Sequence, residues 1–470
     1  MIVAQRFSAG HVKISIIFSE PALAGDRTVA KLQLTKEENS YTPAFRELVR
    51  QRADEPSWLR TAREEAFRHF EHIGFPTVRD EDWKYTNLAP IARGNFSPVI
   101  RNGTAHSFES DPRWLYPETE NSRLVFVNGV LQRNRSSFKL PGDVVAVDLA
   151  DALLQPEYEA HVREQLRLSS QTNGLTALNT ALFSSGAFIL VPRDVELTAP
   201  IHLVFISSVK NGSAPAAFPR VVVIVEENGS ATLVESYIGA HGAYLTDTVV
   251  NVVVGNGARV EHYKVQSESA AAFHIASTFA ATGRDASYQS TNINLGALLS
   301  RHDIAVTFQQ EGGACAVDGL YLIGGDQHSD THSVIDHAPA HCTSRQLYKG
   351  VLDGKSHAVF NGKVFVRHGA QQTDAQQTNK NLLLSEEARV DTKPQLEIFA
   401  DDVKCTHGAA VGQLNDDELF YLESRGINPA LARNMLTYGF AEEVIEKIKI
   451  ESIRKELDQA VMSSLSFGIE

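Results

Sequence analysis

The chain has 470 residues, with 44 Lys and Arg against 57 Asp and Glu, which gives a formal net charge of −13. This acidic balance argues against a protein that wraps nucleic acid, because nucleic acid needs clustered cations. No apolar run approaches the roughly 18 residues that span a membrane. The three cysteines, Cys315, Cys342 and Cys405, are too few and too scattered for a disulfide framework. They indicate a reducing, cytoplasmic setting.

The amino-terminal part of the chain divides into an extension and a mostly helical region. Residues 1–38 contain the segment KISIIFSEPALAG. Its apolar run is shorter than the roughly 7–15 residues of a secretion signal, so we expect an irregular extension there. Residues 39–180 have a mixed, mostly helical pattern, and Gly74 and Pro76 close its first helical stretch.

Residues 181–408 are rich in β-branched runs punctuated by glycine. A motif of glycine followed by Ala-x-apolar recurs at Ala231, Ala258, Ala286 and Ala314, at separations of 27, 28 and 28 residues. A repeat of this kind is typical of a solenoid, whose coils stack because no single coil can bury its own apolar face. We therefore predict a parallel β-solenoid core. The alternative is an antiparallel sandwich with evenly spaced hairpins.

Residues 409–470 predict a helical region. Asn415 stands where an N-cap belongs, with Glu418 three residues later, and Gly426 is a natural helix end. Pro429 fits the first position of a second helix. The amphipathic stretch from residue 441 to residue 465 predicts a third helix.

One segment resembles a phosphate-binding loop without matching it. GVLDGKS, residues 350–356, has three residues between its glycines, where the phosphate loop requires four. It also lies in strand-rich sequence instead of opening a helix. We therefore expect that this chain binds no nucleotide, and that any ATP requirement is met by a partner.

The densest group of histidines lies between residues 326 and 342. It comprises His328, His332, His337 and His341, beside Cys342. Imidazole and thiolate are common ligands of iron and zinc, but the spacing matches no closed zinc site. Two interpretations remain. The residues are polar ladder positions on stacked coils, which is favoured, or they contact a metal or a partner.

A second pair combines a cysteine and a histidine where strand-like sequence gives way to helix. In an extended strand, Cys405 and His407 project on the same face. Together they offer two ligands for a thiophilic metal, which is half a site. The spacing alone favours a packed cysteine with a histidine that caps a carbonyl group.

Four long motifs resemble the SufB/SufD family, the scaffold subunits of the SUF system of iron–sulfur cluster assembly. The resemblance covers about residues 42–455, and the segment CTHGAAVG follows the SufD version. The motifs are DEDWKYTNLAP (80–90), HCTSRQLYKGVLDGKSHAVFNGKVFV (341–366), TDAQQTNKNLLLS (373–385) and VDTKPQLEIFADDVKCTHGAAVGQLNDDELFYLESRGI (390–427). The resemblance implies a right-handed parallel β-helix flanked by amino-terminal and carboxyl-terminal helical regions.

The resemblance also implies partners and a site. It implies a heterodimer with SufB through the β-helix cores and docking of the ATPase SufC on the carboxyl-terminal helices. His407 matches the candidate iron or cluster ligand of the family, with Cys405 as its neighbour, and SufB completes the site. The resemblance further implies that the bound group is a transient iron ion or iron–sulfur cluster and that the chain itself is not a catalyst. The residues expected at the partner interface are Asn415, Phe420, Tyr421, Arg425, Ile445 and Ile448.

Two other functions stay open at this point. A carbohydrate-active enzyme on a β-helix could use aspartates along a groove, among them Asp303, Asp318 and Asp330. The three tryptophans all precede the repeats, which argues against sugar stacking there. A homodimer of the isolated chain without SufB is the other possibility.

Overall fold

The computed structural model describes residues 41–100, 115–141, 143–167, 172–209, 213–239 and 241–464. It also describes strands β1 (Val12–Lys13) and β2 (Thr35–Lys36), which pair antiparallel. Apart from these four residues, the extension predicted over residues 1–38 lies outside the described residues. Within the part of the chain that is described, no helix is both long and apolar enough to cross a membrane.

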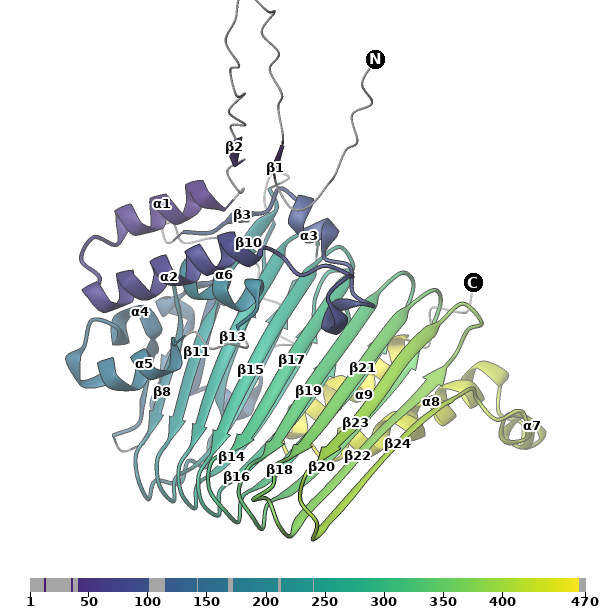
Figure 1. The fold of residues 1–470 in the computed structure, drawn as a ribbon. Coiled ribbons are helices and arrows are strands. Elements are labelled where there is room, and N and C mark those ends of the chain that lie inside the picture. The colour runs from purple at the N-terminus through teal and green to yellow at the C-terminus, as the bar shows by residue number, and fades with distance from the viewer. Residues whose placement is uncertain are drawn as a thin grey trace, which may run out of the picture.

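Two stacked sheets form the body of the molecule (Figure 1). The parallel strands of the front sheet are β8 (Gly186–Val191), β11 (Arg220–Val225), β13 (Leu245–Val254), β15 (Phe273–Thr282), β17 (Leu299–Phe308), β19 (His328–His337), β21 (His357–Val366) and β23 (Arg389–Ile398). Those of the back sheet are β9 (Ile201–Ile206), β12 (Ser230–Ile238), β14 (Arg259–Ser267), β16 (Ser287–Asn294), β18 (Ala314–Ile323), β20 (Thr343–Leu352), β22 (Thr373–Leu383) and β24 (Val403–Gly412). The chain alternates between the sheets and makes about seven turns over residues 201–412. The predicted parallel β-solenoid with helices at both ends is confirmed.

The repeat follows from one corner of each coil, where a residue adopts positive φ. These corner residues are Asn228, Gly257, Asp285, Gly312, His341 and Gln372, with φ between 52° and 75°. The backbone N–H of each donates to a carbonyl group in the next coil. Glycine adopts this conformation freely, and Asn, Asp and His tolerate it better than most residues. The Gly-Ala pattern in the sequence marks the residues next to this corner.

The coils are less uniform than the alanine spacing predicts. The strand register aligns Ser230, Arg259, Ser287, Ala314 and Thr343, so these turns take 29, 28, 27 and 29 residues. Ala231 therefore pairs with Val260 and not with Ala258. The alanine lies between one and three residues after the corner residue in these coils, so the motif still marks each turn although its spacing differs from the strand register.

The amino-terminal region covers the first coils. Its helices are α1 (Thr42–Gln51), α2 (Ser57–Ile73), η1 (Glu81–Trp83), α3 (Ala89–Arg93), η3 (Pro117–Thr119), η4 (Arg133–Arg135), α4 (Leu149–Ala152), η5 (Pro156–Tyr158), α5 (Glu159–Gln165) and α6 (Gly174–Leu182). Apolar side chains of α1, α2 and α6 pack on the outer face of the front sheet, as Leu48 and Phe70 do with Leu245 and Phe273 in one buried cluster. This burial anchors the helices in front of the sheet (Figure 1).

Short strands close the solenoid at this end. They are β3 (Ser97–Pro98), β4 (Ser122–Val127), β5 (Val130–Leu131), β6 (Ser137–Phe138), β7 (Val145–Asp148) and β10 (Pro215–Ala217). β7 pairs antiparallel with β8, and β4 extends the back sheet beside β9. Among the described residues, the first coil therefore presents no long unpaired edge, which protects it from pairing with other chains.

Three helices follow the last strand. They are α7 (Asp416–Ser424), α8 (Pro429–Ile445) and α9 (Glu451–Ser464). Asn415 accepts a hydrogen bond from the backbone N–H of Asp417, and Pro429 opens α8, as predicted. The single helix expected over residues 441–465 is wrong, because α8 ends at Ile445 and a break precedes α9. β24 also continues to Gly412, past the boundary predicted at residue 408.

Helices α8 and α9 pack on the outer face of the back sheet. Val444, Ile448 and Leu457 belong to one buried cluster with Val265 and Leu320 of the sheet. Ion pairs surround this apolar contact: Lys447 Nζ lies 2.7 Å from an Asp318 oxygen, and Lys349 pairs with Glu443. The apolar contact and the ion pairs together fix the two helices to the solenoid.

Candidate functional site at the open end of the solenoid

The carboxyl-terminal end of the solenoid is open, in contrast to the amino-terminal end. β23 and β24 are the last strands of their sheets, so each has one edge without a partner strand among the described residues. The residues of β24 are mostly exposed. Unpaired backbone N–H and C=O groups along a ten-residue strand are a template for another strand.

Cys405 and His407 lie on β24 with their side chains toward the solenoid axis. The register places Cys405 over Ala375 and His407 over Gln377, and both of these residues are buried in the preceding coil. The predicted common face of the pair is therefore confirmed. Cys405 is partly buried against the apolar cluster of the last coils, and burial raises the pKa of its thiol. His407 is exposed at the open end.

A buried acceptor lies beneath His407. The Nε2 of Gln377 donates to Gln346 Oε1 at 2.6 Å, while its Oε1 is buried and lacks a hydrogen-bond partner among the described residues. An unpaired buried acceptor is costly, so it indicates a place where a further donor binds. The open end thus exposes an imidazole, with a partly buried thiol and a buried amide oxygen next to it. Among the described residues, no group of three or more His, Cys, Asp and Glu is placed to hold a metal ion.

The interior of the solenoid becomes polar between the open end and the first coils. Glu235 accepts a hydrogen bond from Tyr237 and lies 2.6 Å from His262 Nε2. Lys264 Nζ lies 2.9 Å from His274, whose Nδ1 is 2.8 Å from Glu268. Burial lowers the pKa of Lys264 to about 8, although two carboxylates partly oppose this effect. These buried charges stabilise one another in a low-dielectric interior.

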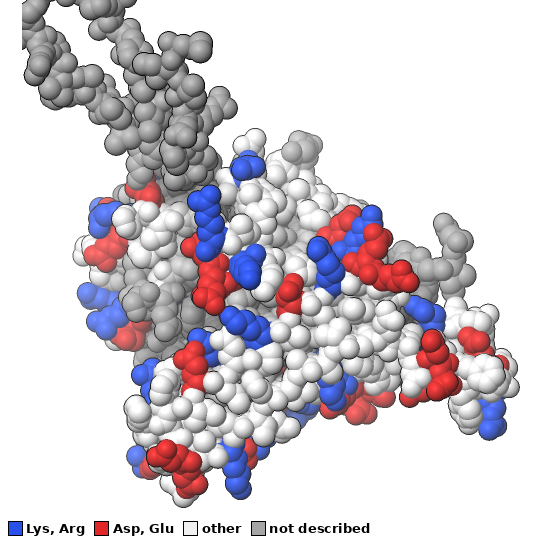
Figure 2. Space-filling view, turned by 45° about the vertical axis from the view of Figure 1, so that its right-hand side comes forward, with Lys and Arg blue, Asp and Glu red and all other residues white. Residues whose placement is uncertain are grey.

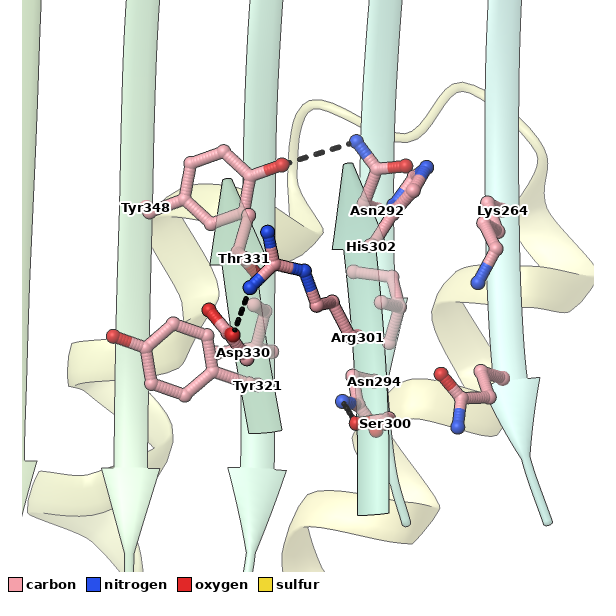
Figure 3. A pocket seen from close by; sticks show the side chains of 13 residues that line it. Lys264, Asn292, Asn294, Ser300, Arg301, His302, Tyr321, Asp330, Thr331 and Tyr348 are labelled. Atoms are coloured by element: carbon pink, nitrogen blue, oxygen red, sulfur yellow. Dashed lines mark hydrogen bonds and ion pairs between the residues drawn. The ribbon is translucent and has the colours of Figure 1, made fainter. Parts of the chain in front are cut away.

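A small cavity adjoins this network. Figure 3 shows Lys264, Asn292, Asn294 and His302 among the side chains around it. Its volume is about 20 Å³, which is room for one water molecule. Asn292 donates to Tyr348 Oη at 3.2 Å, while its own Oδ1 is buried without a partner in the described structure. The cavity is therefore suited to a bridging water.

The sequence did not single out this interior network, although one signal for it exists. Val260, His262 and Lys264 alternate with outward residues along β14, so the two-residue period puts them on one face. The face can be assigned as interior only once the neighbouring strands are known. Charged residues on strands are more often exposed to solvent, so the alternating pattern does not by itself predict a buried network.

The histidines between residues 328 and 341 do not converge. His328 and His332 project from the outer face of β19, where His328 Nε2 lies 2.8 Å from Thr86 Oγ1. His337 has the opposite parity and lies inside the solenoid, 2.8 Å from Ser344 Oγ. His341 is a coil-corner residue, with φ of 61°. The favoured interpretation, polar positions on stacked coils, describes this arrangement.

The cysteine beside these histidines, Cys342, is packed inside the protein. Cys342 is buried, and its Sγ contacts the carbonyl oxygens of Gln310 and Ala340 at 3.6 and 3.5 Å. Burial raises the pKa of this thiol, which disfavours the thiolate that binds metals. A single metal site formed by this group of residues does not exist in the described structure.

The aspartates of the carbohydrate-enzyme alternative are charge partners of other side chains. Asp303 and Asp330 both bind the guanidinium of Arg301 on the front sheet. Asp318 binds Lys447 on the back sheet. Asp303 and Asp330 share one guanidinium on the front sheet, and Asp318 lies on the opposite sheet, so the three carboxylates do not form a free pair that flanks one groove.

The predicted partner-interface residues fall into two groups. Phe420 is 72% exposed and Tyr421 is 56% exposed, and α7, which carries them, has no buried residue. Arg425 lies over the Tyr421 ring at 5.2 Å. Ile445 and Ile448 are 2% and 0% exposed and pack on the back sheet. The prediction that these two isoleucines face a partner is wrong, because the amphipathic face covers this chain's own sheet.

The surface charge is mixed. Figure 2 shows acidic and basic side chains in small groups, separated by broad uncharged areas, on the face that it presents. Such a surface has no single field that steers a highly charged ligand. Recognition on this face therefore depends on local groups of residues.

Comparison with known proteins assigns the family. The family model "SUF system FeS cluster assembly, SufBD core domain" matches residues 205–440, and "SufBD protein N-terminal region" matches residues 35–203. The chain belongs to the SufBD family of the SUF iron–sulfur cluster assembly system. This confirms the resemblance that the motifs indicated.

Individual relatives agree with this assignment. An iron–sulfur cluster assembly SufBD family protein of Synechocystis is 36% identical over 94% of this chain and 98% of its own length. The iron–sulfur cluster assembly protein SufD of Escherichia coli is 32% identical over 84% of this chain and 90% of its own length. SufD of Bacillus subtilis is 27% identical over 89% and 96%. The similarity to these SufBD proteins therefore includes both the helical region and the solenoid.

Proposed function

We propose that this SufBD chain is a non-catalytic, SufD-type scaffold subunit that pairs with SufB and docks the ATPase SufC in the cytoplasm. The open carboxyl-terminal coil carries this proposal. It exposes two unpaired strand edges together with Cys405 and His407, which make half of a metal site. SufB supplies the other half when its own strands add to these edges.

The bound group in this proposal is a transient iron ion or iron–sulfur cluster. Imidazole and thiolate suit iron, and the unpaired Oε1 of Gln377 adds an acceptor for a bound donor. His407 is the main ligand, because it is exposed, whereas the Cys405 thiol is partly buried and has a raised pKa. A homodimer of the isolated chain would use the same two edges.

Helix α7 is the docking surface for SufC in this proposal. It follows the edge strand β24 after a link of three residues, Gln413, Leu414 and Asn415, and it exposes Phe420 and Tyr421. Aromatic residues are frequent hot spots of protein interfaces. When SufC binds ATP and dimerises, a displacement of α7 is transmitted directly to the strand that carries His407.

Replacing His407 by alanine is expected to reduce the iron content of the complex at least about tenfold, since loss even of a group that only orients a ligand has effects of this size. The chain is co-expressed with SufB and SufC, and iron and cluster formation are measured on the isolated complex. The matched control is His72→Ala, which removes an exposed histidine from α2. A His407→Ala complex with the iron content of the control contradicts the site assignment.

Replacing Phe420 by alanine is expected to weaken SufC binding by about 2 kcal/mol, or roughly thirtyfold in Kd, because the ring is the most exposed large apolar group described. Binding of purified SufC is measured by calorimetry. Leu154→Ala is the control, because Leu154 is 62% exposed in the amino-terminal region. Equal affinities of the two variants exclude α7 as the docking surface.

A further inference from the structure

Two segments far apart in the chain meet on the outer face of the front sheet. The Trp83 ring lies 3.6 Å from the guanidinium of Arg301, which also donates to the backbone oxygen of Asp82 at 2.6 Å. Arg301 in turn pairs with Asp330 at 2.7 Å (Figure 3). Thr86 donates to the same aspartate. These buried contacts hold the segment 81–86 at a fixed place over β17 and β19.

A cleft of about 300 Å³ lies between this segment and the sheet. Its floor includes Asp330 and His332, whose Nε2 is 3.1 Å from an Asp330 oxygen. Asn361 of β21 lines it as well, with its Oδ1 occupied by a hydrogen bond from Gln395. The size is at the lower end of the range of about 300–1,000 Å³ for small-molecule sites. The cleft therefore has room for a small polar molecule.

Both walls of the cleft carry both signs of charge. Glu81 and Lys84 line it from the segment, and Asp391 and Lys393 line it from β23. Lys393 Nζ lies 3.1 Å from Glu81 Oε1, so opposite charges already face each other across the cleft. Asp391 also lies 2.8 Å from the Nε2 of His357, which fixes the carboxylate on the sheet.

This charge pattern selects the class of ligand. An anion such as phosphate approaches the carboxylates of Glu81, Asp82 and Asp391, which repel it. A polyamine approaches the ammonium groups of Lys84 and Lys393, which repel it. A molecule with one ammonium and one carboxylate group can pair with both kinds of wall group. We propose that this cleft binds a small zwitterion of the α-amino acid class.

Each charged group of the ligand has partners in this proposal. The ligand carboxylate replaces Glu81 as the partner of Lys393, and the amide of Asn361 is adjacent. The ligand ammonium group binds Asp391 and the carboxylate of Glu81 that it has displaced. His332 and Asp330 below distinguish polar from apolar ligand side chains. This inference does not rest on the scaffold function. Asp391 and Lys393 belong to the edge strand β23, but the cleft uses side chains on the outer face of the sheet, whereas a partner strand would pair with the backbone edge.

The test is calorimetry of the full chain with free α-amino acids, each compared with its N-acetyl derivative and its amide. At least one amino acid is expected to bind with a millimolar or lower Kd. Removal of either ligand charge is expected to weaken binding at least about tenfold. Asp391→Asn and Lys393→Met are expected to cause losses of the same size.

A second ion pair, between β21 and β23, provides matched controls. Lys363 Nζ lies 2.8 Å from Glu397, outside the residues that line the cleft. Lys363→Met and Glu397→Gln should leave binding unchanged. The proposal is overturned if no free amino acid binds at millimolar concentration, or if the N-acetyl and amide forms bind equally well. Binding of Fe²⁺ that Asp391→Asn abolishes, in the absence of amino acid binding, overturns it in favour of a metal site.

Discussion

Replacing Glu235 by glutamine is expected to lower the free energy of unfolding by about 3 kcal/mol, because breaking a buried ion pair leaves the remaining charge uncompensated. Glu235 is fully buried, with His262 at 2.6 Å. Burial alone raises the pKa of this carboxyl group, but the hydrogen bond and charge of His262, the hydrogen bond from Tyr237 and the charge of Lys264 together lower the pKa below its ordinary value. The carboxylate is therefore charged in the folded protein, and Lys264 depends on it.

The measurement is the urea unfolding curve of the variant against that of the wild-type chain. Glu227→Gln is the matched control, since this exposed glutamate pairs with Arg193 at the surface, where such pairs contribute little. A double-mutant cycle with His262→Gln isolates the coupling between the two side chains. If Glu235→Gln unfolds at the same urea concentration as Glu227→Gln, the interior network does not stabilise the solenoid.

The buried charges restrict how the interior of the solenoid can rearrange. An interior that contains Glu235, Lys264 and Glu268 tolerates few rearrangements, because every displaced partner leaves a buried charge. An apolar interior repacks more readily. The polar coils therefore form a rigid segment, which positions the open end relative to the amino-terminal helices.

The solenoid could be predicted from the sequence because its period has a local cause. A corner residue with positive φ recurs in six successive coils, and glycine at Gly257 and Gly312 is the residue that adopts this conformation at least cost. The helix starts at Asn415 and Pro429 were predictable for the same reason, since caps depend on the nearest residues. The nearby residues also locate the corner of each coil, to within about two residues.

The direction in which a strand residue points was harder to predict. His328 and His337 lie on opposite faces of β19, although their closeness in the sequence suggested a single group. A shift of one residue exchanges the two faces, so the assignment requires knowledge of the neighbouring strands. The prediction that Ile445 and Ile448 face a partner was wrong for a related reason. An apolar helix face indicates burial, but the sequence does not reveal whether the cover is the chain's own sheet or a partner.

The candidate site was predictable in part. The two-residue spacing of Cys405 and His407 gave their common face, and the transition to helix gave their place at the end of the core. The unpaired Oε1 of Gln377 beneath them could not be predicted, because it depends on a register between residues thirty positions apart. The cleft beside Trp83 depends on a contact with Arg301 more than two hundred residues away.

Replacing His337 by glutamine is expected to remove about 2 kcal/mol of the pH dependence of stability between pH 7 and pH 5. Burial lowers the pKa of His337 to about 4, although Asp336 partly opposes the shift. In the unfolded chain a histidine titrates near 6.5. Between these two values the unfolded state binds the proton and the folded state does not, so stability rises with pH and is lost as the pH falls below 6.5.

The geometry explains why the folded protein resists this protonation. Nε2 of His337 bonds Ser344 Oγ at 2.8 Å, and Nδ1 is buried without a partner in the described structure, so a second ring proton has no acceptor. Asp247, whose pKa is raised by burial, acts in the opposite direction, but equally in both proteins. The measured quantity is therefore the difference between wild type and variant in urea unfolding free energy at the two pH values. The exposed His241→Gln variant should keep the full wild-type dependence. If His337→Gln keeps it as well, the buried imidazole does not titrate as its surroundings require.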